Sequence, residues 1–136
     1  MDIKEEIQED MKRAEQALQS AERNMEENDV LTSANRLFVA CESAVCAFLK
    51  HQYGNSSVSR ERILTRLREI DERMRKTYDD SYDLRVQADY GKKSRHFPLT
   101  KENIITLRRE VVEVIEKVRT TISHKEKKIN QEKDQP

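Results

Sequence analysis

The sequence is poor in the residues that interrupt regular structure. Its 136 residues include only two glycines, two prolines and no tryptophan. Because glycine and proline mark most turns, their scarcity predicts long helices. No apolar run reaches the 18 or more residues of a membrane span, and the polar start MDIKEEIQED lacks the apolar core of a secretory signal. We therefore expect no contact with a membrane and a place in the cytoplasm.

Potential metal ligands are few and scattered. Cys41 and Cys46 lie five positions apart, about 140° around a helix, so they cannot form a disulfide bond with each other. His51, His96 and His124 fall in three different segments, and no Cys-x-x-Cys pair lies near them. The sequence predicts reduced thiols in the core, no metal site and no cofactor.

The chain also has no excess of positive or negative charge, because 26 basic residues balance 26 acidic ones. A neutral chain has no overall attraction to nucleic acid, so any such contact must be local. Charged residues make up 38% of the chain and apolar ones 35%, which is typical of slender amphipathic helices. A glycine-rich phosphate loop and a Gly-x-Ser-x-Gly motif are both absent from the sequence, which argues against the enzyme classes that they define.

The most apolar stretch runs from Ala34 to Leu49, ANRLFVACESAVCAFL. Its apolar residues recur with the spacing of a helix, at positions 34, 37, 38, 41, 44, 45 and 48. The opposite side carries Arg36 and the small residues Ala40, Ser43 and Ala47, which would let another backbone approach closely. We expect a central helix covered on both sides, with the small-residue side as the contact of a homodimer.

Similar patterns predict the other helices and their ends. The expected helices are one over residues 2–27, a second from a cap at position 28 or 29 to about 53, a third over about 60–75, a short one that ends at Gly91, and a last one from a cap at Thr100 to about 122. Either Asn28 or Asp29 is expected to cap the second helix. The sequence thus predicts an all-α fold, an up-and-down bundle of four or five helices over residues 1–123. A frayed or disordered polar tail is expected over residues 124–136.

Ionisable residues gather near the end of the irregular segment before the last helix. The candidate ligand-binding residues there are Arg85, Asp89, Tyr90, Lys92, Lys93 and Arg95, followed by His96, and the central helix adds Asn35, Arg36 and Glu42 as further ligand-binding candidates. A histidine beside an arginine can move a proton and stabilise a pentacovalent phosphate, which suffices for metal-free RNA cleavage. Arg85 and His96 are therefore the candidate catalytic residues. In the other interpretation, Arg85 pairs with Glu42 or Asp89, Tyr90 packs, and the basic loop is simply exposed.

The order of these segments resembles the HEPN domain family. The resemblance is carried by ANRLFVACESAVCAFL, LRVQADYG, LTKENI and the final amphipathic helix, over about Ser33 to Ile122. The chain looks like small microbial HEPN proteins with an Arg-x-x-Ala-Asp-Tyr segment before the last helix. This resemblance implies a helical bundle that forms a homodimer, often encoded beside a minimal nucleotidyltransferase as a toxin and antitoxin pair.

Active HEPN ribonucleases resemble one another in an Arg-x4-6-His motif, whose arginine and histidine meet at the dimer interface. Arg85 matches the arginine, but the positions of the histidine hold Tyr90, Gly91 and Lys92, and the first histidine is His96. Tyr90 is similar to the tyrosine that some HEPN toxins have modified with AMP by their nucleotidyltransferase partner. The resemblance therefore leaves the nuclease motif incomplete.

Three functions are compatible with these observations. The first is a dimeric HEPN module, weak or silent as a nuclease, that works with a nucleotidyltransferase and binds RNA or a nucleotide. The second is a toxin ribonuclease in which the loop after Gly91 brings His96 to Arg85 of the other subunit. The third is a structural adaptor bundle without a ligand.

Overall fold

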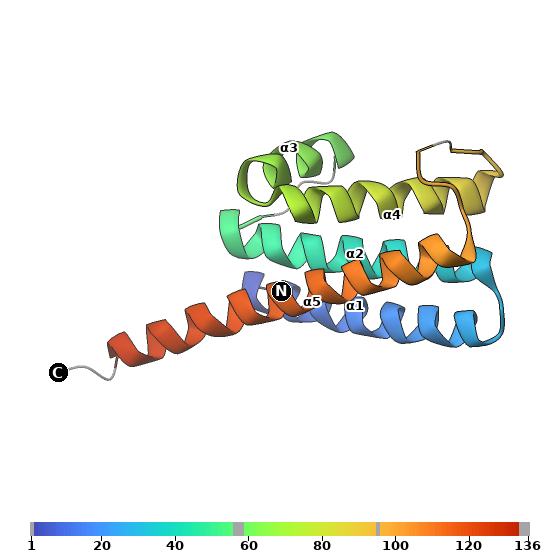
Figure 1. Cartoon of the computed structure of the whole chain (residues 1–136). Helices are drawn as coiled ribbons and strands as arrows, with labels where there is room; N and C mark the ends of the chain where they lie inside the picture. The colour runs from blue at the N-terminus through green and yellow to red at the C-terminus, as the bar shows by residue number, and fades with distance from the viewer. Residues whose placement is uncertain (1, 56–58, 95, 134–136) are drawn as a thin grey trace.

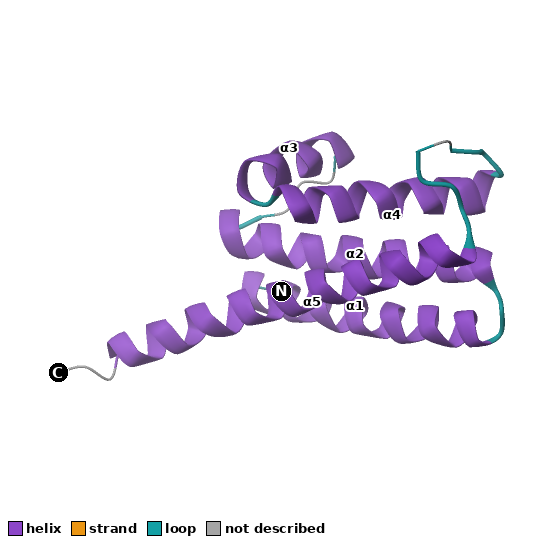
Figure 2. Cartoon of the chain, in the orientation of Figure 1, coloured by secondary structure: helices purple, strands orange, loops and turns teal. Residues whose placement is uncertain are grey.

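The described part of the chain folds into five α-helices (Figures 1 and 2). A computed structural model describes residues 2–55, 59–94 and 96–133, and these residues contain no strand. The helices are α1 (Ile3–Glu26), α2 (Val30–Tyr53), α3 (Arg60–Ile70), α4 (Glu72–Tyr90) and α5 (Lys101–Lys133). Four of them run up and down, while α3 lies against α4. The expected all-α bundle is confirmed.

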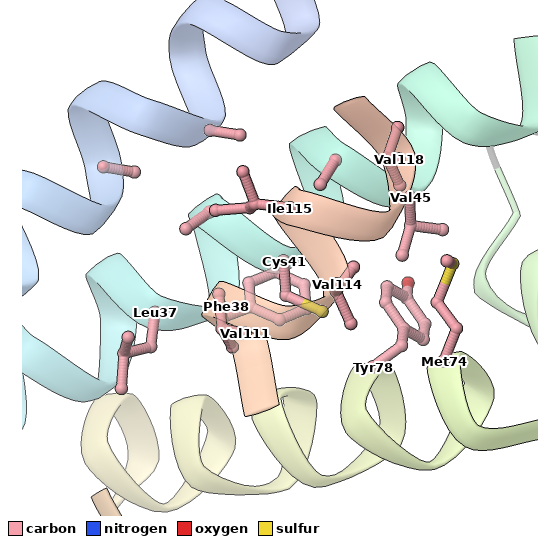
Figure 3. Close-up of a cluster of buried hydrophobic side chains, with 14 of the residues drawn as sticks. Leu37, Phe38, Cys41, Val45, Met74, Tyr78, Val111, Val114, Ile115 and Val118 are labelled. Atoms are coloured by element: carbon pink, nitrogen blue, oxygen red, sulfur yellow. The ribbon is translucent and has the colours of Figure 1, made fainter. Parts of the chain in front are cut away.

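Helix α2 forms the centre of the bundle, because it packs against α1, α4 and α5. Its residues Leu37, Val45 and Leu49 are fully buried. In Figure 3, the side chains of α2 meet those of α4 and α5 around Cys41 and Tyr78. The central helix predicted from the sequence is therefore confirmed.

The small-residue side of α2 is buried inside the chain. Ala40 and Ala47 are 0% exposed, and α1 and α2 pack together more extensively than any other pair of helices. Buried alanines on α1 permit this close approach, and Ser33 Oγ donates a hydrogen bond to the Ala21 carbonyl at 3.1 Å. The prediction of a dimer contact on this side of α2 is wrong, because α1 of the same chain covers it.

Local signals fix the ends of α2 and α4. Asp29 Oδ1 accepts a hydrogen bond from the Thr32 amide at 3.1 Å, so Asp29 rather than Asn28 caps α2. Gly54 and Gly91 follow α2 and α4 with φ angles of 81° and 66°. Glycine adopts this left-handed conformation without a steric penalty, and it stops both helices where the sequence predicted.

Two helices occupy the region where the sequence predicts one helix over 60–75. The chain leaves the helical conformation at Asp71, which has φ −161° and ψ 89°. Asp71 Oδ1 accepts a hydrogen bond from the Met74 amide at 3.0 Å, so one residue ends α3 and caps α4. The expected short helix before Gly91 is instead the 19-residue α4.

The sequence does not predict the full length of α4, because half of the inward face of this helix is polar. The buried residues of this face are Met74, Thr77, Tyr78, Ser81, Leu84 and Gln87, which recur every three or four positions. The hydroxyls of Thr77 and Ser81 donate to carbonyls of α4 itself, at 3.2 and 2.8 Å. Both hydroxyls therefore find an acceptor within α4, and Ser81 also forms a hydrogen bond with Cys41 of α2.

Helix α5 is the longest element and extends past the bundle. It has 33 residues and continues to Lys133, where the sequence predicts a frayed tail. Its last turns project beyond the start of α1 in Figure 1. The sequence after His124 is rich in lysine and glutamate and contains no glycine, and lysine and glutamate are good helix formers. The limit of the domain at residue 123 stays a prediction.

Candidate functional site

One side of α2 is left open between α1 and α4. Asn35, Val39, Glu42 and Cys46 recur every three or four positions and are half-buried, whereas their neighbours toward α1 and α4 are buried. We call these four residues the α2 strip. Through it another molecule can touch the central helix of the bundle directly.

Arg85 of α4 lies beside the α2 strip. Its guanidinium carbon is 5.0 Å from the centre of the Phe38 ring, and its Nε is 3.3 Å from Asp89 Oδ2. Asn35 Nδ2 donates to the same oxygen at 3.4 Å, while Arg36 donates to Asn35 Oδ1 at 3.2 and 2.6 Å. The Arg85 side chain is 33% exposed, so its guanidinium is held in place and still open to solvent.

Glu42 carries the negative charge of the α2 strip. Burial raises the pKa of its carboxyl, and the Arg85 guanidinium and a hydrogen bond from Tyr78 oppose that shift. Burial and the nearby Glu42 also raise the pKa of Tyr78, which keeps its hydroxyl protonated as a donor. Arg85 therefore acts on both acids suggested by the sequence, on Asp89 as an ion pair and on Glu42 through its charge.

A second arginine extends this arrangement toward α3. The guanidinium carbon of Arg60 is 4.0 Å from the centre of the Tyr82 ring, and Arg60 also pairs with Asp79. Tyr82 meets Phe38 edge-on, with ring centres 5.8 Å apart. We call Arg60, Tyr82, Phe38 and Arg85 the arginine–aromatic row. Sequence analysis missed it because its members come from three helices, and a helical spacing connects only Tyr82 with Arg85.

The other candidate residues lie at the end of α4 and in the loop that follows. Tyr90 is 68% exposed on the last turn of α4. Lys92, Lys93 and His96 are exposed in the loop, and Arg95 lies outside the described residues. The described side chains among them are therefore open to solvent, and Tyr90 is largely exposed where the other interpretation had it pack.

This loop folds back along α4 and is held there by hydrogen bonds. Ser94 Oγ donates to Asp83 Oδ2 at 2.9 Å. The buried Gln87 side chain donates to the Phe97 carbonyl at 2.8 Å and accepts from the Leu99 amide at 2.9 Å. The loop on both sides of residues 95 and 96 is therefore fixed to the side of α4 that carries Asp83 and Gln87.

That side of α4 faces away from Arg85. At about 100° per residue, Asp83 and Gln87 each lie about 160° from Arg85 around the helix. His96 lies between Ser94 and Phe97, both of which are bonded on this far side. Within one chain, the structure does not bring together the two residues that the sequence offered for catalysis.

In the described part of the chain, no three His, Cys, Asp or Glu side chains are grouped so that they could hold a metal ion. Neither cysteine is in a disulfide bond, and burial raises the pKa of Cys41 to about 12, so its thiol stays neutral. In the same residues, no helix has both the length and the apolar content to cross a bilayer.

The fold and the site define a class of protein: a small all-α bundle whose central helix is open on one side and edged by arginines. The family model of the HEPN domain matches residues 7–125. The chain therefore belongs to the HEPN family, whose members generally serve as nuclease or RNA-binding modules and commonly dimerise. A search of curated proteins gives no match to this sequence.

Proposed function

We propose that this chain is a dimeric HEPN module, weak or silent as a ribonuclease, that binds RNA or a nucleotide beside Arg85 and the α2 strip. One observation carries the proposal: the loop around His96 is bonded to the side of α4 opposite Arg85. Acid–base catalysis needs both groups within hydrogen-bond reach of the same phosphate. Within one chain the two groups lie on opposite sides of α4, so cleavage would require His96 of one subunit to reach Arg85 of the other.

The contacts of Arg85 also favour binding over catalysis. Its guanidinium already faces the Phe38 ring and the Asp89 carboxylate. To stabilise a phosphate during cleavage, it would have to exchange Asp89 for the developing charge. As a binding residue it can stay on the ring and offer its exposed edge to a phosphate, because guanidinium groups donate in several directions.

The α2 strip supports the proposed dimer. It places the apolar Val39 and Cys46 between the polar Asn35 and Glu42, with all four half-buried. The residues beside it include the pairs Arg60 with Asp79 and Arg85 with Asp89, so both signs of charge are available for ion pairs with a second copy. An isologous contact here would bring the Arg85 residues of both subunits to one cleft.

A substitution on the α2 strip tests the dimer. Val39→Arg adds a long cation to the strip and should convert the dimer to a monomer. Ile70→Arg changes an isoleucine that is 41% exposed on α3, away from the strip, and serves as the control. Light scattering after size-exclusion chromatography gives the mass of each variant. Equal masses for both variants would show that the contact lies elsewhere.

RNA binding and cleavage separate the proposal from the toxin ribonuclease. The chain is incubated with short single-stranded RNAs without metal, and new 2′,3′-cyclic phosphate ends are sought. We expect none, and we expect Arg85→Ala to weaken RNA binding by about tenfold. His96→Ala should leave binding unchanged, as should Arg62→Ala, which changes an exposed arginine of α3. Cleavage that is lost in His96→Ala would instead favour a ribonuclease completed between subunits.

We further propose a minimal nucleotidyltransferase as the partner, with Tyr90 as the residue that receives AMP. The 68% exposure of Tyr90 supports this, because its oxygen is accessible for attack on the α-phosphate of ATP, with pyrophosphate as the leaving group. Mass spectrometry after incubation with such an enzyme and ATP should locate the adenylate on Tyr90. Tyr90→Phe should stay unmodified, whereas Tyr53→Phe, which changes another exposed tyrosine, should react normally.

The structural adaptor makes a different prediction for the same variants. It requires that alanine at both Arg85 and Tyr90 alters stability but leaves every interaction intact. Retained RNA binding and retained partner binding in this double variant would therefore favour the adaptor over the ligand-binding module.

A further inference from the structure

A groove separates α1 and α5 on the side of the bundle away from the α2 strip. Three hollows of about 340, 270 and 250 Å³ follow one another along it. The first shares Glu22 with the second and Glu15 with the third, so the three form one continuous depression. We call it the α1–α5 groove. The α2 strip opens between α1 and α4 instead, so the two surfaces are separate.

Both walls of the groove present apolar residues at the spacing of packed helices. Met11, Leu18 and Met25 recur every seven residues on α1, and Ile105 and Val112 do so on α5. A seven-residue repeat corresponds to two turns of a helix that packs alongside another helix. Yet α1 and α5 contact each other sparsely, so these residues are only partly covered.

The two walls carry opposite charges. The α1 side presents Glu15, Glu22 and Glu26 against a single cation, Lys12, and is net acidic. The α5 side presents Arg108 and Arg119 against a single acid, Glu116, and is net basic. The pairs Glu22 with Arg108 and Glu15 with Arg119 span the groove, and all four side chains are more than a third exposed. Exposed ion pairs contribute little to stability, so both can exchange partners when another charged molecule enters.

We propose that the α1–α5 groove is a docking site for an amphipathic helix of another protein. Its occupant has apolar residues at seven-residue spacing, basic residues along the edge that meets α1, and acidic residues along the edge that meets α5. Met11 and Met25 lie fourteen residues apart, about 21 Å along α1, so about four turns of helix fill the groove.

The shape of the groove favours a single helix over a second copy of this chain. A second copy applied groove to groove would set two concave surfaces against each other and leave the hollows unfilled. A lone helix is convex and fills them, because its side chains pack between those of both walls. The proposal does not depend on the function of the α2 strip, which stays accessible when the groove is occupied.

A designed peptide tests the docking site. The probe is a fluorescent peptide of three heptads with leucine at two positions of each, lysine along one edge and glutamate along the other. Its binding to the full chain is followed by fluorescence anisotropy. Ile105→Glu and Leu18→Glu should each weaken binding by about tenfold or more. A peptide with glutamate along both edges should bind more weakly, since one edge then faces the acids of α1.

The control for Ile105→Glu is Ile70→Glu. The two isoleucines are 44% and 41% exposed, but Ile70 lies on α3 outside the groove, so its variant should bind like the unchanged chain. Circular dichroism checks that each variant is folded. The proposal is overturned if the mixed-charge peptide does not bind, or if Ile70→Glu loses as much affinity as Ile105→Glu. A changed mass of Ile105→Glu in light scattering would also overturn it, because the groove would then join copies of this chain.

Discussion

An ion pair between Asp10 of α1 and Lys50 of α2 lies inside the contact of these helices. Oδ2 and Nζ are 2.7 Å apart, and the side chains are only 8% and 16% exposed. Lys50→Met keeps the length of the side chain but leaves the Asp10 carboxylate buried without this cation. Removing one partner of a buried pair costs about 3–5 kcal/mol. Arg13 lies 3.6 Å from the other carboxylate oxygen, so we expect the lower end, about 3 kcal/mol.

Urea denaturation followed by circular dichroism measures this loss. A loss of about 3 kcal/mol multiplies the unfolding equilibrium constant by about a hundred. With a slope of about 1–3 kcal/mol per molar, the midpoint should fall by about 1–3 M urea. Asp10→Asn should cost less, because the long stem of Lys50 can carry its ammonium group to solvent.

The double variant Asp10→Leu with Lys50→Met provides the decisive comparison. It replaces the pair by apolar side chains, so most of the stability lost in Lys50→Met should return. A loss below about 1 kcal/mol for Lys50→Met would refute the reasoning, because the carboxylate would then be adequately solvated. A double variant that is no more stable than Lys50→Met alone would also refute the reasoning.

Three further predictions concern residues with separate roles. Ala40→Leu overpacks the contact of α1 with α2 and should lower the free energy of unfolding by about 1–3 kcal/mol in calorimetry; unchanged stability with a changed mass would contradict this. Asp71→Ala removes the cap of α4 and should cost about 1–2 kcal/mol in urea denaturation, whereas Asp71→Asn, which can still cap, should cost less. Burial holds the pKa of Glu42 above its unfolded value of 4.5, so the folded state binds this proton more tightly. The stability that protonated Glu42 contributes to the fold is therefore complete at pH values below the unfolded pKa. It is lost as the pH rises through the folded pKa. The melting temperature of the unchanged chain should therefore decline as the pH rises through this range, and Glu42→Gln should remove that decline. An unchanged pH profile in Glu42→Gln would show that Glu42 is not its source.

The helices that the sequence reveals are those whose buried faces are apolar. α2 can be predicted from the sequence because nearly every inward residue is aliphatic, aromatic or a thiol, and Gly54 marks its end. The full length of α4 cannot be predicted in this way, since Thr77 and Ser81 occupy inward positions and donate hydrogen bonds to carbonyls of α4 itself. The break at Asp71 was missed for a related reason: aspartate is common on exposed helix faces, and only its position between two helices makes it a cap.

The candidate site was only partly predictable. Arg85 and Asp89 are four positions apart, so their ion pair follows from helical spacing. The separation of His96 from Arg85 does not, because it depends on where Gln87 bonds the returning loop. Side chains that meet across helices depend on how the bundle assembles, and a single sequence records no such distances.

The central position of α2 has a consequence for synthesis of the chain on the ribosome. α1 and α2 are neighbours in sequence and can pair as soon as both have emerged. The side of α2 that meets α5 stays uncovered until Ile104 to Val118 are made, about 55 to 70 residues after Leu49. At about 5–20 residues per second, this takes about 3–14 seconds. During that interval a pair of helices with an open apolar face exists, and it is then that the nascent chain most needs protection from aggregation.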